Sequence, residues 1–467
     1  MFIGRKNELS WLEEMLSHSK KKLFPIVIYG PRRVGKTTLI KRFMEGKESF
    51  YFFVNETKSS PVLASEAANE IRKKDKKAEM LSLESWDKIL KYLIEESPFE
   101  AVIFDEFQNF QNANSSVFGT LQNLIDSNEN KGKLLIFLGS STGMMKELFE
   151  DTHAALYGRI KSKLFLSPLG FRDCIDGLKK MGYKEDKEMA GFYFVFGGYP
   201  KYLSALEDFS IGAKPINELL RTLFFSKNAA FQEEVQDVLR AEFGKRGANY
   251  YSIMEAIATG HTKLSEIASY SGLSVTSLSP FMRDLCDYHE LVERKLPIMR
   301  SKTRDTRYAL KSPLFRFWFR FVRPNLSSLE IGRYDLLMEN IKKNLDSYSG
   351  LEFERLAKEY LVSNAGKNKL DFSEIGGWWS KGREIDLVTL GAENCAWECK
   401  WSHISRGEAL KIRRALEENS ALAGIKDARF GLVSREMDAG ADEYFDYVAD
   451  LGDIFEGKLP HHNRRKA

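Results

Sequence analysis

The chain has 467 residues, of which 43% are hydrophobic and 29% are charged, and its formal net charge is only +4 at pH 7. This length predicts about three or four domains, and the composition is typical of a globular protein. The small net charge excludes a surface that attracts nucleic acid over its whole extent, so any such contact must come from a local patch. The four cysteines are too few for a disulfide framework, and no run of residues is apolar and long enough for a transmembrane helix. We therefore expect a cytoplasmic protein without a membrane partner.

The first informative element is a glycine-rich turn between a predicted strand at 24–29 and a predicted helix that starts near residue 38. The turn matches the spacing G-x-x-x-x-G-K-[ST] and consists of Gly30, Pro31, Arg32, Arg33, Val34, Gly35, Lys36 and Thr37, with Thr38 opening the helix. A strand, a turn and a helix N-terminus in this order direct backbone N–H groups and the positive end of the helix dipole at one point, which suits a polyphosphate. Lys36 is expected to reach the β- and γ-phosphates of a nucleotide, and Thr37 to bind Mg²⁺ through its hydroxyl.

Two acids close a second apolar strand, which is predicted at 101–105. Asp105 and Glu106 would stand at the carboxyl edge of a parallel sheet, where open α/β sheets bind ligands. We expect Asp105 to hold Mg²⁺, directly or through water, and Glu106 to orient or deprotonate the water that attacks the γ-phosphate. A third strand, at 134–138, leads to Ser140, whose side chain is expected to sense the γ-phosphate. An ordinary Gly-Ser loop is the alternative interpretation at that position.

Strand and helix patterns alternate along the first part of the chain. The predicted strands are 24–29, 50–54, 101–105, 134–138 and 163–166. This alternation predicts an α/β fold over residues 1–170, with a parallel sheet covered by helices on both faces. From 171 to 245 the strand pattern is lost and amphipathic helices follow, which we interpret as a helical lid. Gly197, Gly198 and Pro200 break one of these helices and start another.

Residues 246–325 have the pattern of a winged helix. The segment 264–278 has the spacing of a helix-turn-helix, with Gly272 at the turn, and predicted strands at 291–294 and 304–310 would form the wing. Lys302, Arg304 and Arg307 would lie on or near the wing, where they could contact phosphates. The recognition helix at 277–288 is poor in arginine and lysine, so a packing or autoinhibitory module is the alternative.

Three acids and a lysine recur in the last predicted domain, at 330–457, which precedes a basic tail at 458–467 that we expect to be a solvated end. Glu354 lies on an amphipathic helix, Asp386 begins a strand, and Glu398 and Lys400 project from one face of the next strand. A hairpin would bring Asp386 beside Glu398. The three carboxylates would then bind Mg²⁺ and Lys400 would position or deprotonate a water that attacks a phosphodiester. A surface hairpin with ordinary salt bridges is the alternative.

The N-terminal motifs together resemble the archaeal-type ATPase family within the STAND class of P-loop NTPases. The likeness covers nearly the whole chain and rests on the opening segment at 2–9, the phosphate-binding turn, the acidic strand, and shorter elements at 139–141, 156–159 and 198–200. The resemblance implies that the nucleotide is ATP and that Arg5 and Asn7 lie near the adenine. It also implies that Arg159 approaches the γ-phosphate.

The C-terminal motif is similar to the PD-(D/E)XK nuclease superfamily, represented here by Glu354, Asp386, Glu398 and Lys400. This likeness implies a C-terminal α/β domain of the restriction-endonuclease type. The chain departs from the superfamily pattern because Ile385, rather than a proline, precedes Asp386.

The sequence therefore favours an ATP-binding and ATP-hydrolysing switch protein that is coupled to a DNA-binding, Mg²⁺-dependent nuclease-like domain. The alternative is a regulatory ATPase whose winged helix and C-terminal domain bind nucleic acid or a protein partner without cutting. A helicase-like motor is a weaker third hypothesis, because the sequence shows no second arginine-rich translocation motif. DNA is the expected macromolecular partner, and assembly into a homo-oligomer stays open.

Overall fold

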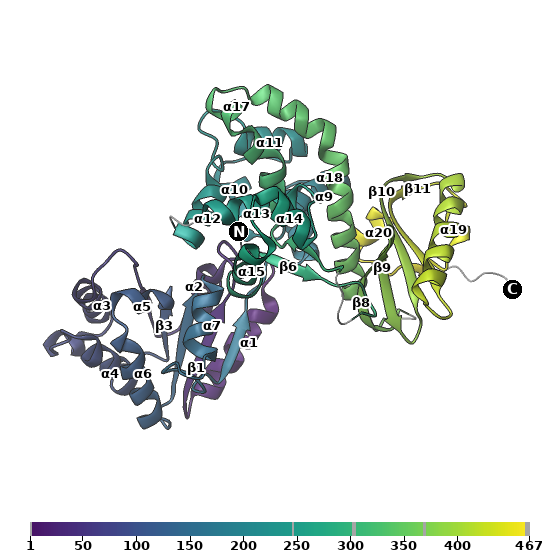
Figure 1. Ribbon diagram of the computed structural model, residues 1–467. Helices are drawn as coiled ribbons and strands as arrows, with labels where there is room; N and C mark the ends of the chain where they lie inside the picture. The colour runs from purple at the N-terminus through teal and green to yellow at the C-terminus, as the bar shows by residue number, and fades with distance from the viewer. Residues whose placement is uncertain (1, 245–246, 301–304, 368–369, 463–467) are drawn as a thin grey trace. The chain divides into compact units, whose positions relative to one another are not determined.

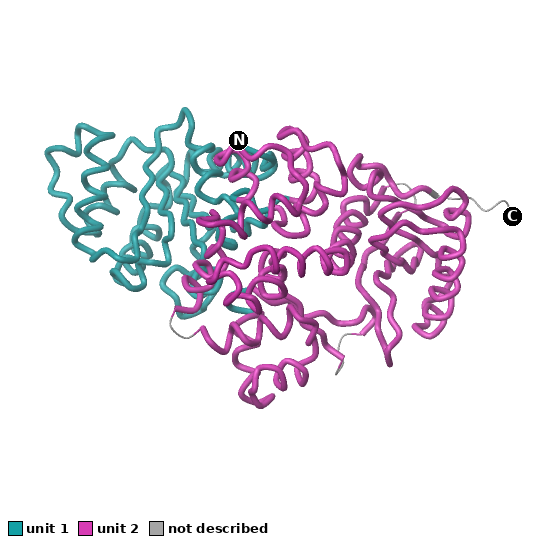
Figure 2. Tube along the Cα trace, turned by 90° about the horizontal axis from the view of Figure 1, so that it is seen from above, with its two compact units in different colours: residues 1–169, 199–201, 287–290 teal, residues 170–198, 202–286, 291–467 magenta. Residues whose placement is uncertain are grey.

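The computed structural model describes residues 2–244, 247–300, 305–367 and 370–462. It divides into two compact units, drawn in teal and magenta in Figure 2. Unit 1 contains Met1–Leu169, Tyr199–Lys201 and Asp287–Glu290, and unit 2 contains the remaining segments. Unit 2 thus takes in most of the predicted lid and winged helix, and the whole predicted C-terminal domain.

Unit 1 is built on a five-stranded sheet in the order β2-β3-β4-β1-β5. Every neighbouring pair is parallel. The strands are β1 (Leu23–Tyr29), β2 (Ser49–Phe53), β3 (Ala101–Asp105), β4 (Lys133–Gly139) and β5 (Ser162–Phe165). Their apolar runs place side chains alternately on two faces, so that Ile26 and Ile28 join one hydrophobic cluster and Val27 joins another. The predicted parallel α/β sheet is therefore confirmed.

Helices cover both faces of this sheet (Figure 1). On one face pack α1 (Lys6–Ser19) and α2 (Lys36–Met44), through Leu12, Ile40 and Phe43 among others. The other face is covered by α3 (Ser60–Lys74), α4 (Trp86–Glu95), α6 (Ser116–Ser127) and α7 (Thr142–Glu150), with the short elements η1 (Lys76–Met80), η2 (Phe107–Asn109) and α5 (Phe110–Ala113) between them. The two buried clusters fix the plane of the sheet and therefore the positions of the strand ends.

Unit 2 begins with a helical region. Its helices are α8 (Phe171–Lys180), α9 (Asp186–Phe196), α10 (Pro200–Asp208), α11 (Ile216–Phe224) and α12 (Glu234–Phe243), of which the first residues of α10 belong to unit 1. Gly197 ends α9 with a φ of 60°, and Pro200 opens α10, as the glycine and proline pattern predicts.

A helix–hairpin module follows, over 248–310. It consists of α13 (Ala248–Ala258), α14 (Leu264–Ser271), α15 (Val275–Arg283), a short π-helical turn η4 (Asp284–Tyr288), and the antiparallel strands β6 (Val292–Lys295) and β7 (Arg307–Leu310). Gly272 closes α14 in the left-handed region, with a φ of 68°. Lys302 and Arg304 lie outside the described residues, and the guanidinium of Arg307 lies over the ring of Trp379 and pairs with Glu384.

The C-terminal part holds a six-stranded sheet in the order β13-β12-β11-β10-β9-β8. Its strands are β8 (Phe372–Ser380), β9 (Arg383–Gly391), β10 (Cys395–Ile404), β11 (Arg429–Met437), β12 (Tyr447–Ala449) and β13 (His461–His462), with α19 (Arg406–Ala423), η7 (Asp442–Tyr444) and α20 (Leu451–Glu456) along the same stretch. The pairs of β8 with β9, β9 with β10 and β12 with β13 are antiparallel, and β10, β11 and β12 run parallel. Within the predicted tail, His461 and His462 form β13 while the His461 side chain is exposed, and residues 463–467 lie outside the described part of the chain.

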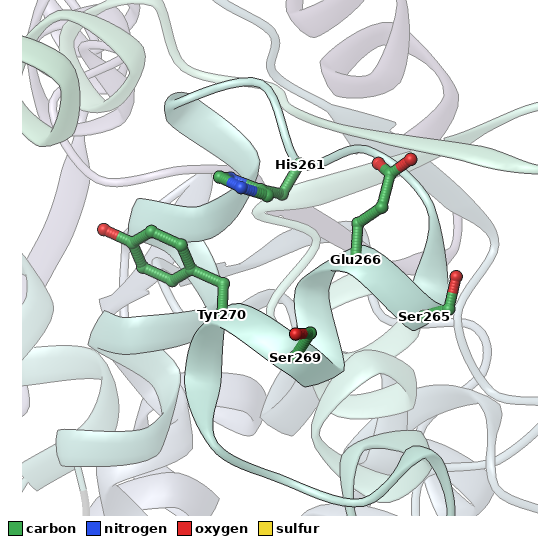
Figure 3. Close-up of a pocket in the computed structure, with 5 residues that line it drawn as sticks. All are labelled: His261, Ser265, Glu266, Ser269 and Tyr270. Carbon is green, nitrogen blue, oxygen red and sulfur yellow. The ribbon is translucent and has the colours of Figure 1, made fainter.

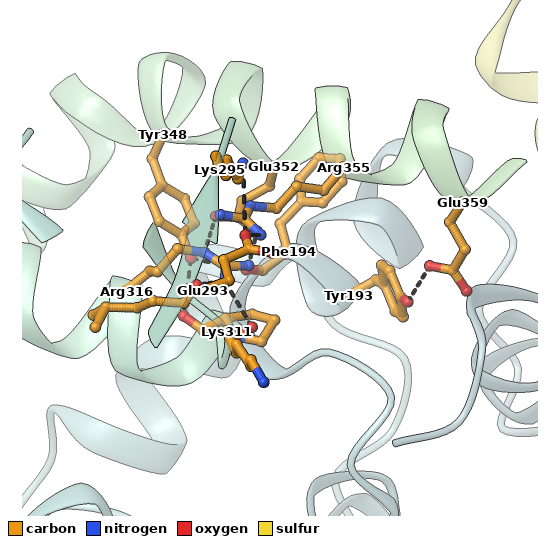
Figure 4. Close-up of polar contacts among 12 residues, drawn as sticks. Tyr193, Phe194, Glu293, Lys295, Lys311, Arg316, Tyr348, Glu352, Arg355 and Glu359 are labelled. Atoms are coloured by element: carbon orange, nitrogen blue, oxygen red, sulfur yellow. Dashed lines mark hydrogen bonds and ion pairs between the residues drawn. The ribbon is translucent and has the colours of Figure 1, made fainter. Parts of the chain in front are cut away.

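The long helix α18 (Tyr334–Ser363) joins the parts of unit 2 through polar contacts (Figure 4). It follows α16 (Pro313–Phe317), the turns η5 (Trp318–Val322) and η6 (Arg323–Asn325), and α17 (Leu326–Glu330). Glu352 forms a bidentate pair with Arg316 of α16. Arg355 bonds Glu293 of β6 at 2.8 Å, and Glu359 accepts from the Tyr193 hydroxyl of α9 at 2.7 Å. Because Arg316 and Glu352 are largely buried, loss of one partner would leave an unpaired buried charge.

Gly30 marks a close approach of two chain segments in unit 1. A Cβ atom built on Gly30 would lie 2.3 Å from the carbonyl oxygen of Leu166, and the φ of Gly30 is +152°. Replacing Gly30 by alanine should therefore force β1 and β5 apart and lower the local free energy of unfolding by about 2 kcal/mol or more. Hydrogen exchange of the β1 and β5 amides measures this change.

The matched control for this prediction is Gly119→Ala on α6. A Cβ atom at Gly119 meets no atom within 4 Å, and its φ is that of an ordinary helix. The same substitution there should stabilise α6 by about 0.5–1 kcal/mol. Equal protection of β1 in the Gly30→Ala variant and the parent chain would contradict the prediction.

Candidate functional site

The glycine-rich turn lies between the end of β1 and the first residue of α2. Gly35 precedes α2 in the left-handed region, with a φ of 86°, and no side chain caps the helix. The first N–H groups of α2 therefore face the turn, where an anion is favoured. The Lys36 side chain is buried and its ammonium donates to the carbonyls of Gly30 at 2.8 Å and Pro31 at 2.9 Å, so it curls back over the turn.

Arg5 forms hydrogen bonds that link this turn to the segment after β5. Its guanidinium donates to the carbonyl of Val34 at 3.0 Å and to the carbonyl of Ser167 at 2.6 Å. Glu8 pairs with the same side chain at 2.8 Å. The structure thus places the buried Arg5 against the backbone of the phosphate-binding turn, whereas Asn7 is exposed on α1. A position of either residue near adenine stays a prediction.

The carboxylate of Asp105 stands at the end of β3, beside the turn. Its Oδ2 atom accepts from the Thr37 hydroxyl at 2.7 Å and from the Tyr51 hydroxyl at 2.7 Å. Burial, followed by the charge of Asp105, raises the pKa of Tyr51, so its hydroxyl stays a donor at neutral pH. A hydroxyl and a carboxylate oxygen in contact are the donors that Mg²⁺ prefers, and the pair therefore fits that ion.

Tyr51 is a member of this site that sequence reasoning missed. It lies on β2, and β2 is the neighbour of β3 in the sheet. The signal for it was present in the strand pattern, because Tyr51 alternates with the buried Phe50 and Phe52 and must face the other side of the sheet.

Glu106 follows Asp105 and is held by two side chains. Its Oε2 atom accepts from the Ser140 hydroxyl at 2.7 Å and from the Gln108 amide at 2.5 Å. Ser140 comes directly after β4, and Gln108 belongs to η2. The structure therefore brings Ser140 to Glu106, while its predicted contact with a γ-phosphate is untested.

Arg159 lies away from the phosphate-binding turn. Its guanidinium forms a bidentate pair with Asp126 of α6, with a shortest distance of 2.7 Å. Arg159 precedes β5, which runs parallel to β1, so it stands at the amino edge of the sheet, whereas the turn follows the carboxyl end of β1. The structure does not bring this predicted catalytic residue to the site within unit 1.

The four predicted C-terminal residues come from three elements. Glu354 lies on α18, Asp386 on β9, and Glu398 and Lys400 on β10. Asp386 accepts from the backbone N–H of Cys399 at 2.8 Å, and the Lys400 ammonium pairs with Glu398 at 2.6 Å. Burial, followed by the charges of Glu398 and Glu354, raises the pKa of Asp386 well above its usual value. Burial also raises the pKa of Glu354 to about 7.

These acids influence one another, but they do not form a ready metal centre. Among the residues that the structure describes, no three His, Cys, Asp or Glu side chains gather closely enough to hold a metal ion. The oxygen chemistry of Glu354, Asp386 and Glu398 would suit Mg²⁺, whereas their arrangement does not fit it. Lys295 of β6 is a neighbour that the sequence did not reveal, and its positive charge opposes the rise in the pKa of Glu354.

A shallow hollow of about 520 Å³ lies on the helix–hairpin module (Figure 3). It is lined by His261, Ser265, Glu266, Ser269 and Tyr270. The Glu266 carboxylate accepts from the backbone N–H groups of Thr262 and Lys263 and so caps α14. The carboxylate that lines the hollow therefore already has a structural role at the start of α14.

The parallel sheet, the glycine-rich turn after β1 and the two acids at the carboxyl end of β3 define a P-loop nucleoside triphosphatase. Residues 2–206 match the model of an ATPase domain predominantly from Archaea, and residues 318–412 match a model of archaeal and bacterial proteins of unknown function. An uncharacterized protein of Methanocaldococcus jannaschii, MJECL04, is 32% identical over 451 residues, which cover 94% of this chain and 97% of that protein. The chain therefore belongs to this archaeal-type ATPase family.

Two further comparisons cover smaller parts of the chain. The uncharacterized ATP-binding protein MJ0423 of M. jannaschii is 52% identical over 48 residues, which cover 10% of this chain and 78% of that protein. The Walker-type ATPase PABY2304 of Pyrococcus abyssi has a similar fold, with a TM-score of 0.51 and 20% identity over 68% of this chain and 96% of that chain. Within the described residues, no helix has the length and apolar character needed to cross a membrane.

Replacing Tyr51 by phenylalanine removes one of the two hydroxyl donors to Asp105. Asp105 would then be oriented by Thr37 alone, whose hydroxyl is also an expected Mg²⁺ ligand. We expect the Mg²⁺ concentration for half-maximal ATP hydrolysis to rise about tenfold, the usual scale for loss of a partner behind a metal ligand. A Mg²⁺ titration of the steady-state rate measures this.

The exposed Tyr157 offers the matched control, because Tyr157→Phe changes the same group at the surface. That variant should keep the Mg²⁺ dependence of the parent. A Tyr51→Phe variant with an unaltered Mg²⁺ titration would contradict the assigned role.

Proposed function

We propose that the protein is an ATP-binding and ATP-hydrolysing switch of the STAND type. The observation that carries this proposal is the contact between Thr37 and Asp105, which joins the phosphate-binding turn to the acidic end of β3. The family match supports the ATPase part, and the presence of a second group of acids in unit 2 motivates the switch part.

The residues of unit 1 can perform the hydrolytic step in a simple order. The N–H groups of α2 and the Lys36 ammonium bind the phosphates, for which Lys36 exchanges its two carbonyl partners for phosphate oxygens. Mg²⁺, held by Thr37 and Asp105, would neutralise charge on those phosphates. Glu106 orients the attacking water and accepts its proton, and Ser140 keeps the Glu106 carboxylate in place.

Two substitutions separate binding from chemistry. Lys36→Ala should weaken ATP binding, because the buried ammonium is lost from the turn. Glu106→Gln should keep binding and lower kcat by about 100-fold or more, because the amide cannot accept the proton. Steady-state hydrolysis and the Kd for an ATP analogue test both. Hydrolysis that survives in Glu106→Gln at the parent rate would reject the proposed role of Glu106.

A second candidate function concerns the C-terminal sheet. Asp386, Glu398 and Lys400 lie at one place on β9 and β10, and Glu354 of α18 is close enough to influence Asp386. This placement supports a nuclease-like domain that acts on DNA, with the helix–hairpin module as a winged helix. The alternative, a platform that binds nucleic acid or a protein without cutting, is supported by the arrangement of the acids, which does not form a three-carboxylate metal centre.

A DNA cleavage assay distinguishes these two readings of unit 2. Linear, nicked and single-stranded DNA are incubated with Mg²⁺ or Mn²⁺, with and without ATP. If the domain is a nuclease, Asp386→Asn and Lys400→Ala should each abolish cutting, whereas Lys411→Ala on the exposed face of α19 should not. Absence of cutting by the parent, with ATP hydrolysis and DNA binding intact, would favour the platform.

A further inference from the structure

Gln108 is an unusual residue for the interior of unit 1. Its side chain is 2% exposed, and its Nε2 atom donates to the Oε2 atom of Glu106 at 2.5 Å. Its other polar atom, Oε1, is buried and accepts no hydrogen bond from the residues that the structure describes. A buried amide oxygen without a partner is destabilising, so a residue that only filled this space would be better apolar.

The orientation of the amide is fixed by chemistry. A carboxylate can only accept, so the atom of Gln108 that faces Glu106 must be the nitrogen, and the oxygen must point away. The oxygen then points toward Gly139 at the end of β4, where an added Cβ atom would come within 2.7 Å of it and would lie closer still to the Met145 side chain. The absence of a side chain at Gly139 therefore makes room for both the Met145 side chain and the amide that contacts Glu106.

The backbone around Gln108 is held rigidly. Glu106 has a left-handed conformation, with φ 54° and ψ 44°, which turns the chain from β3 directly into η2 and brings residue 108 beside residue 106. Phe107, between them, is fully buried, and its ring centroid lies 4.4 Å from that of Phe137. The donor of Gln108 is thus presented from a fixed point.

We propose that Gln108 is a positioning residue for ATP hydrolysis, which acts by fixing the carboxylate of Glu106. This inference rests on the proposed role of Glu106 as the group that orients water. A glutamate side chain has several rotatable bonds, and a free carboxylate would sample many positions. With one oxygen held by both Gln108 and Ser140, the carboxylate keeps a single orientation at the edge of the sheet. Small displacements of such a group are costly to the rate.

The test is Gln108→Met, which keeps the length and volume of the side chain and removes both polar atoms. We expect kcat for ATP hydrolysis to fall about tenfold or more, with the KM for ATP and the Kd for a non-hydrolysable ATP analogue changed less than about twofold. Thermal stability should stay the same or increase, because the unpaired buried oxygen is gone. A variant with a lower kcat and an equal or higher thermal stability is a result that a purely structural role would not give.

Gln111→Met is the matched control. Gln111 is exposed on α5, so this variant introduces the same substitution three residues away without changing a buried contact. It should leave kcat and stability unchanged. Gln108→Asn is a second test variant, whose amide is one methylene too short to reach Glu106. It should show the same loss of kcat, and it decides the question if Gln108→Met does not fold.

Parent-like kcat in either Gln108 variant would overturn the proposal, as would a loss of kcat matched by an equal loss of stability or nucleotide affinity. Failure of both variants to fold would also overturn it, since Gln108 would then be a structural residue. The Glu106→Gln variant separates this from the proposed function. If Glu106→Gln is inactive while Gln108→Met is fully active, only the inference about Gln108 fails. If Glu106→Gln is fully active, the role of Glu106 fails and the inference with it.

Discussion

The site in unit 1 depends on the close approach of β1 and β5 at Gly30. The backbone N–H of Leu166 donates to the carbonyl of Tyr29 at 2.8 Å, and the carbonyl of Leu166 occupies the space that a side chain on Gly30 would need. Arg5 then bridges the segment after β5 and the phosphate-binding turn, through the carbonyls of Ser167 and Val34. The turn is therefore held on both sides before any ligand binds, and its N–H groups need little rearrangement to receive phosphates.

Each of the two acids at the end of β3 accepts hydrogen bonds from two side chains of other elements. Thr37 and Tyr51 donate to Asp105, and Ser140 and Gln108 donate to Glu106. The donors come from four elements of unit 1: the first turn of α2 (Thr37), the middle of β2 (Tyr51), the residue after β4 (Ser140) and η2 (Gln108). Parallel register thus converts residues distant in sequence into one group of fixed polar side chains, the kind of preorganisation that electrostatic catalysis requires.

Much of this arrangement could be predicted from the sequence, for a physical reason. A buried parallel strand reads as a continuous apolar run, so the ends of β1 and β3 were visible in the residue pattern, and with them the phosphate-binding turn and the acid pair. Tyr51 and Gln108 could not be assigned in the same way. The partner of Tyr51 lies on another strand, and the contact of Gln108 requires the left-handed conformation of Glu106, which a non-glycine residue rarely adopts.

The position of Arg159 could not be predicted from the sequence. An arginine in a loop next to a strand is compatible with either edge of the sheet, and only the pairing of β5 with β1 shows that this loop is at the amino edge. The C-terminal acids show a third case. The hairpin of β9 and β10 was readable, and it brings Asp386 to the backbone of Cys399, but the distance of Glu354 from them depends on how α18 packs against β10.

The two groups of acids in this chain are in different electrostatic conditions. Asp105 and Glu106 each accept two side-chain hydrogen bonds from uncharged donors. Asp386 is buried near Glu398 and Glu354, and its raised pKa means that ionising it is unfavourable in the folded chain. Since the folded-state pKa lies above the ordinary value, this carboxyl opposes folding as the pH rises through that range.

Interactions elsewhere in unit 2 must offset this unfavourable contribution. The residues of α18 that contact Arg316, Glu293 and Tyr193 lie on the same helix as Glu354. The position of α18 is therefore the structural variable that sets how closely the acids of unit 2 approach one another.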